Sequence, residues 1–195
     1  MGDEKLRLFT AVRVPRDQLE WLDGAVGELK RLPEARWTSL DHRHVTLNFL
    51  GWVESSLLPQ TVAAVDAAAL GHAPAEVSLG PLGAFPRERR ARVLWAGLHD
   101  PAGLLTALAE DLGERLRTMG YEPEERAYTP HLTLARLKTP RSLAGLLPDL
   151  PAPPKPFIVD RVTLFRSRLH PAGARYEVLH ESYLTADAGD TGRSE

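Results

Sequence analysis

The 195-residue chain contains no cysteine, which excludes disulfide bonds, thiolate zinc sites and a cysteine nucleophile. It has no run of about 18 apolar residues, and its first residues, MGDEKLRLFTAV, lack the pattern of a secretion signal. A net charge of −2 argues against a broadly basic coat for nucleic acid. With 43% hydrophobic and 26% charged residues, the composition is that of a globular protein, which we expect in the cytoplasm and away from membranes.

Two short stretches of the sequence are nearly identical: HVTLNFL at His44–Leu50 and HLTLARL at His131–Leu137. When the first half is moved forward by about 86 positions, the strand-like and helix-like patterns around the two stretches also match in order. An ancient duplication explains this order, and chance matching of common patterns is the alternative. The repeat units run approximately over 6–85 and 92–168, and they predict two similar lobes around a pseudo-twofold axis.

Hydrophobic periodicity predicts the elements of each unit. The expected strands cover 6–14, 36–50, 75–85, 92–99, 127–138, 157–167 and 176–184. The first expected helix begins near Pro15. Further helices are expected over 56–70, with Ser55 or Ser56 as its N-cap, and over 102–119 and 142–147. We predict one bilobed domain over 1–185, followed by a flexible tail over 186–195.

The repeated motif can carry acid–base chemistry. Side chains alternate along a strand, so His44 and Thr46 share one face of their strand. In the second motif, His131 and Thr133 share a face in the same way, and in both motifs the aliphatic neighbours point to the opposite face. Of two imidazoles across a cleft, one can accept a proton while the other donates one, and the threonine hydroxyls can hold phosphate oxygens. This chemistry needs no metal or covalent intermediate. Structural histidines and a two-histidine zinc site are the alternatives, although no HExxH is present.

The two motifs with their flanks, RHVTLNFLG and YTPHLTLAR, resemble those of the two-histidine (2H) phosphoesterases. LFTAVRVP near the start and LFRSRL near the end agree with the bacterial and archaeal RNA 2',3'-cyclic phosphodiesterase branch, historically called 2'-5' RNA ligase. The resemblance covers about 6–184. It implies an α+β fold in which two mainly antiparallel sheets, related by a pseudo-twofold axis, surround a central cleft with helices outside.

The resemblance also implies a reaction. His44 would be the proton donor and His131 the proton acceptor, with Thr46 and Thr133 binding phosphate, although the residues alone permit either assignment of the histidines. The expected substrate is RNA with a 2',3'-cyclic phosphate end, tRNA fragments among them, which a monomer would hydrolyse to a 2'-phosphate without a cofactor. The reverse reaction would form a 2'-5' linkage. Alternatives are a phosphodiesterase for small cyclic nucleotides or 2'-5' oligonucleotides, and a non-catalytic module that binds RNA ends.

Further residues are candidates for contacts at the rim of the site, with ordinary surface ion pairing as the alternative. They are Arg136, Arg126, Tyr128 and Arg166. Strict alternation points Arg136 away from the histidine face, so a twist or bulge must bring it back. Asn48 stands where the resemblance leads us to expect a basic residue. The run RERRAR at Arg87–Arg92 predicts either a basic rim or a solvated loop.

Overall fold

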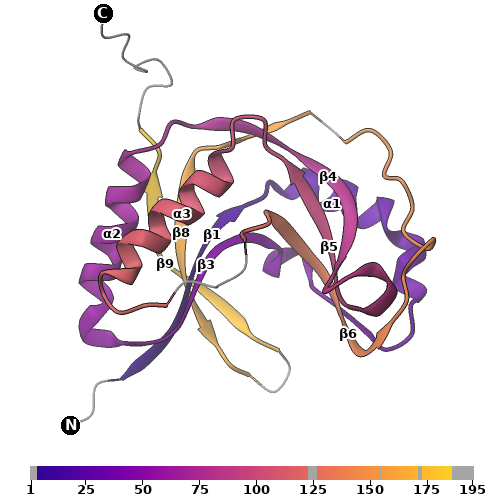
Figure 1. Ribbon diagram of the computed structural model, residues 1–195, viewed down its shortest axis with the longest axis horizontal. Coiled ribbons are helices and arrows are strands. Elements are labelled where there is room, and N and C mark those ends of the chain that lie inside the picture. The colour runs from indigo at the N-terminus through magenta and orange to yellow at the C-terminus, as the bar shows by residue number, and fades with distance from the viewer. Residues whose placement is uncertain (1–3, 123–126, 154, 171–172, 186–195) are drawn as a thin grey trace, which may run out of the picture.

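The computed structural model describes residues 4–122, 127–153, 155–170 and 173–185 (Figure 1). Its strands are β1 (Lys5–Arg13), β2 (Ala35–Trp37), β3 (His44–Glu54), β4 (Ala75–Phe85), β5 (Ala91–His99), β6 (His131–Arg141), β7 (Phe157–Val159), β8 (Arg161–Arg168) and β9 (Arg175–Tyr183). Its α-helices are α1 (Arg16–Ala25), α2 (Leu58–Leu70) and α3 (Leu104–Arg117). Short 3-10 turns are η1 (Gly27–Arg31), η2 (Leu40–His42), η3 (Ser55–Leu57) and η4 (Glu88–Arg90). The predicted tail over 186–195 lies outside the described residues.

The strands form one sheet in the order β7-β4-β5-β6-β3-β1-β8-β9, with β2 added to β6. All its pairings are antiparallel, which confirms the α+β class. The two predicted sheets are the halves of this continuous sheet. Within the described residues they are joined between β3 and β6 by a single pair, Val45 with Leu132. Because β4 pairs with β5 and β8 pairs with β1, each half contains strands from both predicted repeat units; the duplication itself stays a prediction.

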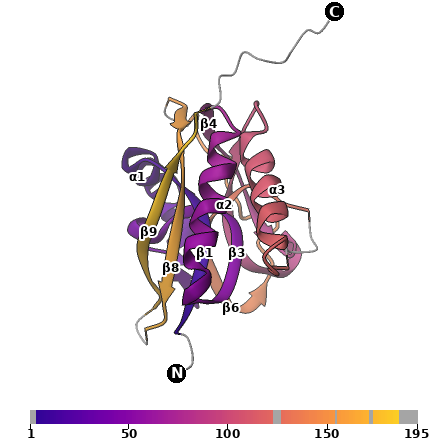
Figure 2. The same cartoon turned by 90° about the vertical axis from the view of Figure 1, so that its left-hand side faces the viewer.

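Helices α2 and α3 lie side by side over the half of the sheet that contains β1, β3 and β8 (Figure 2). The apolar spacing of α3 explains this position, because Leu105, Leu108 and Leu112 fall on one face and are fully buried. Asp100 fixes where α3 begins, since its carboxylate accepts hydrogen bonds from the backbone N–H groups of Leu104 and Leu105 at 3.1 and 2.7 Å.

Several local predictions were wrong. The strand expected over 36–50 is divided into β2 and β3 by η2, and the one over 157–167 is divided into β7 and β8. Residues 142–147 form a turn and not a helix, because Leu143 enters the core and Gly145 has a φ of 73°, in the left-handed region. Helix α2 begins after η3, and neither Ser55 nor Ser56 is its N-cap. Within the described ranges, none of the helices combines the length and apolar character needed to span a bilayer.

Candidate active site

The two repeated motifs, each of the form HxTL, lie side by side where the two halves of the sheet join. Val45 and Leu132 are direct partners there, and both are buried, at 1% and 0% exposure. Continuing this antiparallel register puts His44 beside Thr133 and Thr46 beside His131, all on the face opposite the buried pair. Diagonal neighbours of this kind have Cα atoms about 7–8 Å apart, so the histidines lie on either side of a space that a phosphate group can occupy. The structure thus brings the four motif residues together.

Each motif ends in a bulge. In β6, Trp95 pairs with Thr133 while Leu94 pairs with Ala135, so Leu134 is an extra residue. In β3, Thr46 and Asn48 pair with consecutive residues of β1, which leaves Leu47 as the extra residue. A bulge reverses the alternation that follows it, and Arg136 therefore lies on the side of Thr133.

A cavity of about 170 Å³, which we call the central cavity, opens on the histidine face. Its wall contains Arg7, Phe9, Thr38, His42, His44, Thr46, Phe49, Thr133, Arg136, Ser167 and Tyr176. Two arginines and several hydroxyl groups therefore line it, and none of these lining residues is acidic. His131 stands next to the cavity and not in its wall. This composition suits an oxyanion such as phosphate.

The ring of His44 is held by aromatic neighbours and by the backbone. It stacks on Phe9 at 4.8 Å between ring centroids and meets the edge of Tyr176 at 5.2 Å. Burial lowers the pKa of His44 from 6.5 to about 4; a backbone hydrogen bond with His42 opposes this shift, and the nearby His42 and His131 rings reinforce it. His44 is therefore neutral near pH 7 when the cavity holds no anion.

The ring of His131 is fixed in a similar way. Its Nδ1 lies 2.7 Å from the carbonyl oxygen of Thr129, and its ring meets Phe85 edge-on at 4.9 Å between centroids. A ring nitrogen this close to a carbonyl oxygen must carry hydrogen, which makes Nε2 the nitrogen that can accept a proton from a substrate. In both motifs the residue two positions before the histidine supplies the backbone group that orients its ring.

The other predicted residues have different positions. Tyr128 donates a hydrogen bond to the backbone carbonyl of Thr46 at 2.9 Å. It therefore holds the backbone of the first motif and is not a residue of the rim. Arg166 also does not reach the rim: Phe165 and Ser167 face the cavity side, alternation turns Arg166 to the other face, and its guanidinium pairs with Glu4. Arg126 lies outside the described residues.

Asn48 points away from the central cavity. Because of the bulge at Leu47, its amide donates a hydrogen bond to the carbonyl oxygen of Ala109 in α3 at 3.0 Å. The lack of a basic side chain at this position therefore leaves the cavity unchanged.

Sequence reasoning missed Arg7 and Tyr176. Arg7 donates a hydrogen bond from Nη1 to Ser167 at 3.0 Å, and its guanidinium lies 4.6 Å above the centre of the Phe49 ring. The sequence indicates that Arg7 and Phe9 share a face of their strand. Which face of β1 lines the cavity, however, depends on its pairing with β3 and β8. Within the described ranges, no three His, Asp or Glu side chains gather as a metal-binding cluster.

Residues 17–171 match the profile of the 2'-5' RNA ligase superfamily, which is more than half of the chain. The chain belongs to this superfamily. Among curated members, it is 33% identical to the RNA 2',3'-cyclic phosphodiesterase of Methanothermobacter thermautotrophicus, over 88% of this chain and 95% of that protein. It is 30% identical to the protein of the same name from Thermotoga maritima, over 90% and 94%.

Solved structures share the fold. A protein from Thermus thermophilus superposes with a TM-score of 0.78 at 29% identity, covering 92% of this chain and 98% of that one. E. coli LigT complexed with 3'-AMP superposes with a TM-score of 0.75 at 27% identity, covering 94% and 100%. The two-histidine phosphoesterase resemblance is thereby confirmed.

Proposed function

We propose that this protein hydrolyses the 2',3'-cyclic phosphate ends of RNA, tRNA fragments among them, to 2'-phosphate ends, and that it does so as a monomer in the cytoplasm. The arrangement of His44, Thr46, His131 and Thr133 on one face, beside a cavity with two arginines and no carboxylate, is the observation that carries the proposal. Superfamily membership and the shared name of the curated relatives support the same reaction.

The proposed reaction is an in-line displacement at phosphorus. His131 takes a proton from water as the water oxygen forms a bond to phosphorus. The bond from phosphorus to the 3' oxygen breaks, and His44 gives its proton to that oxygen, which leaves a 2'-phosphate and a 3'-hydroxyl. Thr46, Thr133 and Arg136 stabilise the charge on the non-bridging oxygens.

The low pKa of His44 fits this role once the substrate is bound. In the empty cavity, burial keeps the imidazole neutral at pH 7. A phosphodiester carries a negative charge beside the ring, and a nearby opposite charge raises the pKa of a histidine. Substrate binding therefore favours the protonated form of His44, which is the form that donates a proton to the leaving oxygen.

The same site can run the reaction in reverse. A 5'-hydroxyl in the position of water, deprotonated by His131, would attack the cyclic phosphate and form a 2'-5' linkage. The name of the superfamily matches this direction.

An oligoribonucleotide that ends in a 2',3'-cyclic phosphate tests the proposal. We expect a 2'-monophosphate product, with and without EDTA, and a loss of about 10²–10⁴ in rate for either His44→Ala or His131→Ala, the range that general acid–base catalysis contributes. Binding without product formation would instead establish the RNA-end binding module. Full activity in both single variants would disprove the assignment of the histidines.

A further inference from the structure

Two arginines face each other next to the central cavity. Arg36 in β2 is the direct cross-strand partner of Arg136 in β6, which places their side chains on the same face of the sheet. Like charges in this position repel each other and destabilise the pair of strands. Both side chains are exposed, and within the described residues neither has a carboxylate partner. An anion between them would remove the repulsion.

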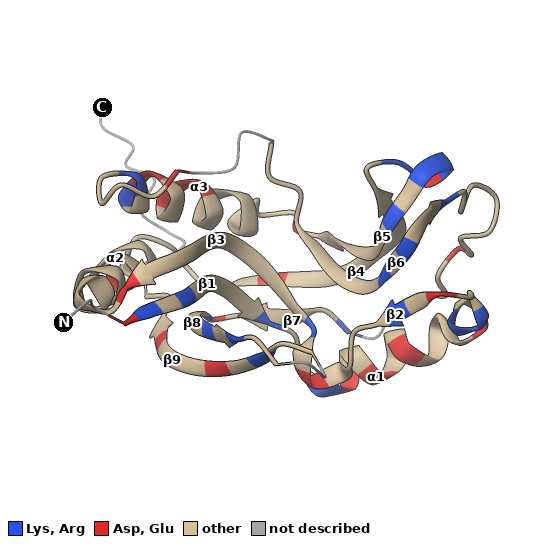
Figure 3. Cartoon of the chain, turned by 90° about the horizontal axis from the view of Figure 1, so that it is seen from below, with Lys and Arg blue, Asp and Glu red and all other residues tan. Residues whose placement is uncertain are grey.

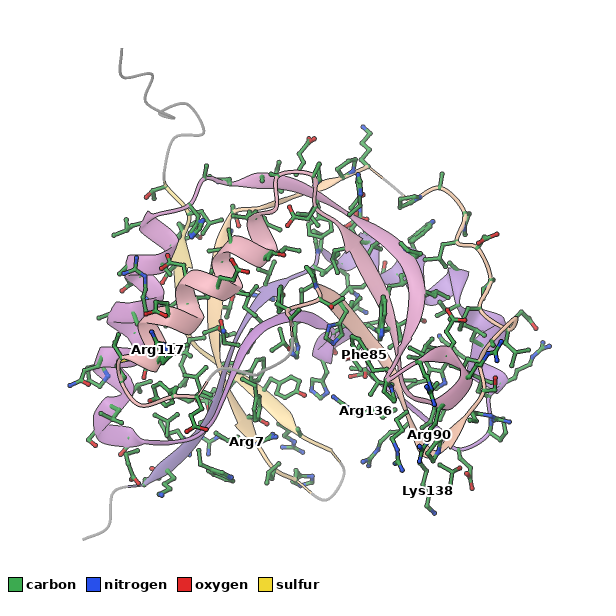
Figure 4. The ribbon with its side chains drawn as sticks, in the orientation of Figure 1. Arg7, Phe85, Arg90, Arg117, Arg136 and Lys138 are labelled. Atoms are coloured by element: carbon green, nitrogen blue, oxygen red, sulfur yellow. The ribbon has the colours of Figure 1, made fainter. Side chains whose placement is uncertain are left out.

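More cations continue from this pair. Lys138 follows Arg136 on the same face of β6, and Arg90 lies in η4, which packs against β6. Figure 4 shows Arg136 next to the gap between the two halves, and Arg90 and Lys138 farther out on the same half. We call Arg36, Arg136, Lys138 and Arg90 the basic strip.

The basic strip differs from the other half of the molecule. There, the arginines of β8 are neutralised: Arg161 pairs with Asp160, Arg166 with Glu4 and Arg168 with Glu177. Within the described residues, no member of the basic strip takes part in an ion pair. Figure 3 shows this contrast, with lysines and arginines along β6 and both signs of charge along β8 and β9. In a chain with a net charge of −2, this unpaired charge is concentrated beside the site.

We propose that the basic strip binds the phosphodiester backbone of the RNA strand that leads to the reacting phosphate, which rests on the proposed function. Arg136 connects the strip to the central cavity, and Arg36 and Lys138 lie beyond the cavity wall. Arg136 and Lys138 are about 7 Å apart along the strand, a spacing close to that of successive phosphates in extended RNA. The strip therefore makes an oligonucleotide a better substrate than a cyclic mononucleotide, which cannot reach it.

The test compares a 2',3'-cyclic mononucleotide with a ten-nucleotide RNA that ends in the same group, using the double variant Arg36→Gln, Lys138→Gln. We expect kcat/KM for the RNA to fall about tenfold or more at low salt, and its slope against the logarithm of salt concentration to become shallower by about 1.4, since each single-strand phosphate contact contributes about 0.7. The value for the mononucleotide should change less than twofold.

Arg115→Gln, Arg117→Gln is the matched control, because it removes two positive charges from α3, on the far side of the other half (Figure 4). It should leave both substrates within twofold of wild type. An unchanged rate on the RNA in the strip variant, or an equal loss on both substrates, would overturn the inference. Wild-type protein that turns over neither substrate would contradict the proposed function instead.

Discussion

Val45 and Leu132 are partners across the junction of β3 and β6, and this buried apolar pair sets the geometry of the polar face on its other side. Antiparallel pairing at the second residue of each HxTL motif brings each histidine beside the threonine of the other motif. The core thereby positions the site. The neighbouring strand β1 supplies Arg7, and β6 itself supplies Arg136 beyond its motif.

The threonines should each stabilise the transition state through one hydroxyl group. Valine has nearly the same shape as threonine and lacks that hydroxyl, so Thr46→Val and Thr133→Val should each lower kcat by about 10²-fold, the loss found when one donor to a developing oxyanion is removed. Steady-state rates on a cyclic phosphate substrate measure this. Thr46→Ser and Thr133→Ser keep the hydroxyl and should retain most of the activity. Full activity in either valine variant would remove that residue from the phosphate site.

Arg136 and Arg166 offer a direct comparison. Arg136 lines the central cavity, and a charge-assisted hydrogen bond to a phosphate oxygen contributes about 1.5–3 kcal/mol, so Arg136→Gln should reduce kcat/KM about 10- to 100-fold. Arg166→Gln breaks only an ion pair with Glu4 and should leave kcat/KM within twofold. The opposite ranking would show that the cavity wall has been assigned to the wrong arginine.

The sequence predicted the strands and the shared face of His44 and Thr46 because both depend on local alternation and burial. It could not place Arg136, because a bulge at Leu134 reverses the alternation and a bulge depends on the partner strand. Arg166 was a candidate for the rim with surface ion pairing as the alternative, and only the pairing of β8 reveals which way it faces. Tyr176 comes from the last strand, so its contact with His44 depends entirely on tertiary structure.

Tyr128 should act as a positioning residue. Its hydroxyl donates a hydrogen bond to the carbonyl oxygen of Thr46, and burial raises its pKa, so it stays protonated. Tyr128→Phe should lower the free energy of unfolding by about 1 kcal/mol, the usual net value of a hydrogen bond, and reduce kcat severalfold with little change in KM. Denaturant titrations and steady-state kinetics measure the two effects.

Tyr121→Phe is the control for this variant. The Tyr121 hydroxyl lies 3.4 Å from the Thr61 hydroxyl and, within the described residues, makes no hydrogen bond to a motif residue, so its loss should cost less stability and leave kcat unchanged. Equal kinetic effects in the two variants would mean that the hydrogen bond to Thr46 has no special part in the site.

His44 should make stability depend on pH. Its pKa is about 4 in the native protein and 6.5 in the unfolded chain, so between these values the unfolded state binds a proton that the native state does not. Stability therefore falls as pH is lowered from 6.5 to 4, by at most about 3.5 kcal/mol, since each unit of pKa difference corresponds to about 1.4 kcal/mol. His44→Gln removes this contribution, and its unfolding free energy, measured by urea titration across this range, should decline less steeply than that of the wild type. Sulfate in the cavity should flatten the wild-type profile, because a bound anion raises the native pKa. Parallel profiles for the wild type and His44→Gln would show that burial does not lower the pKa of the ring, and binding of an anion would then not be needed to reverse such a shift.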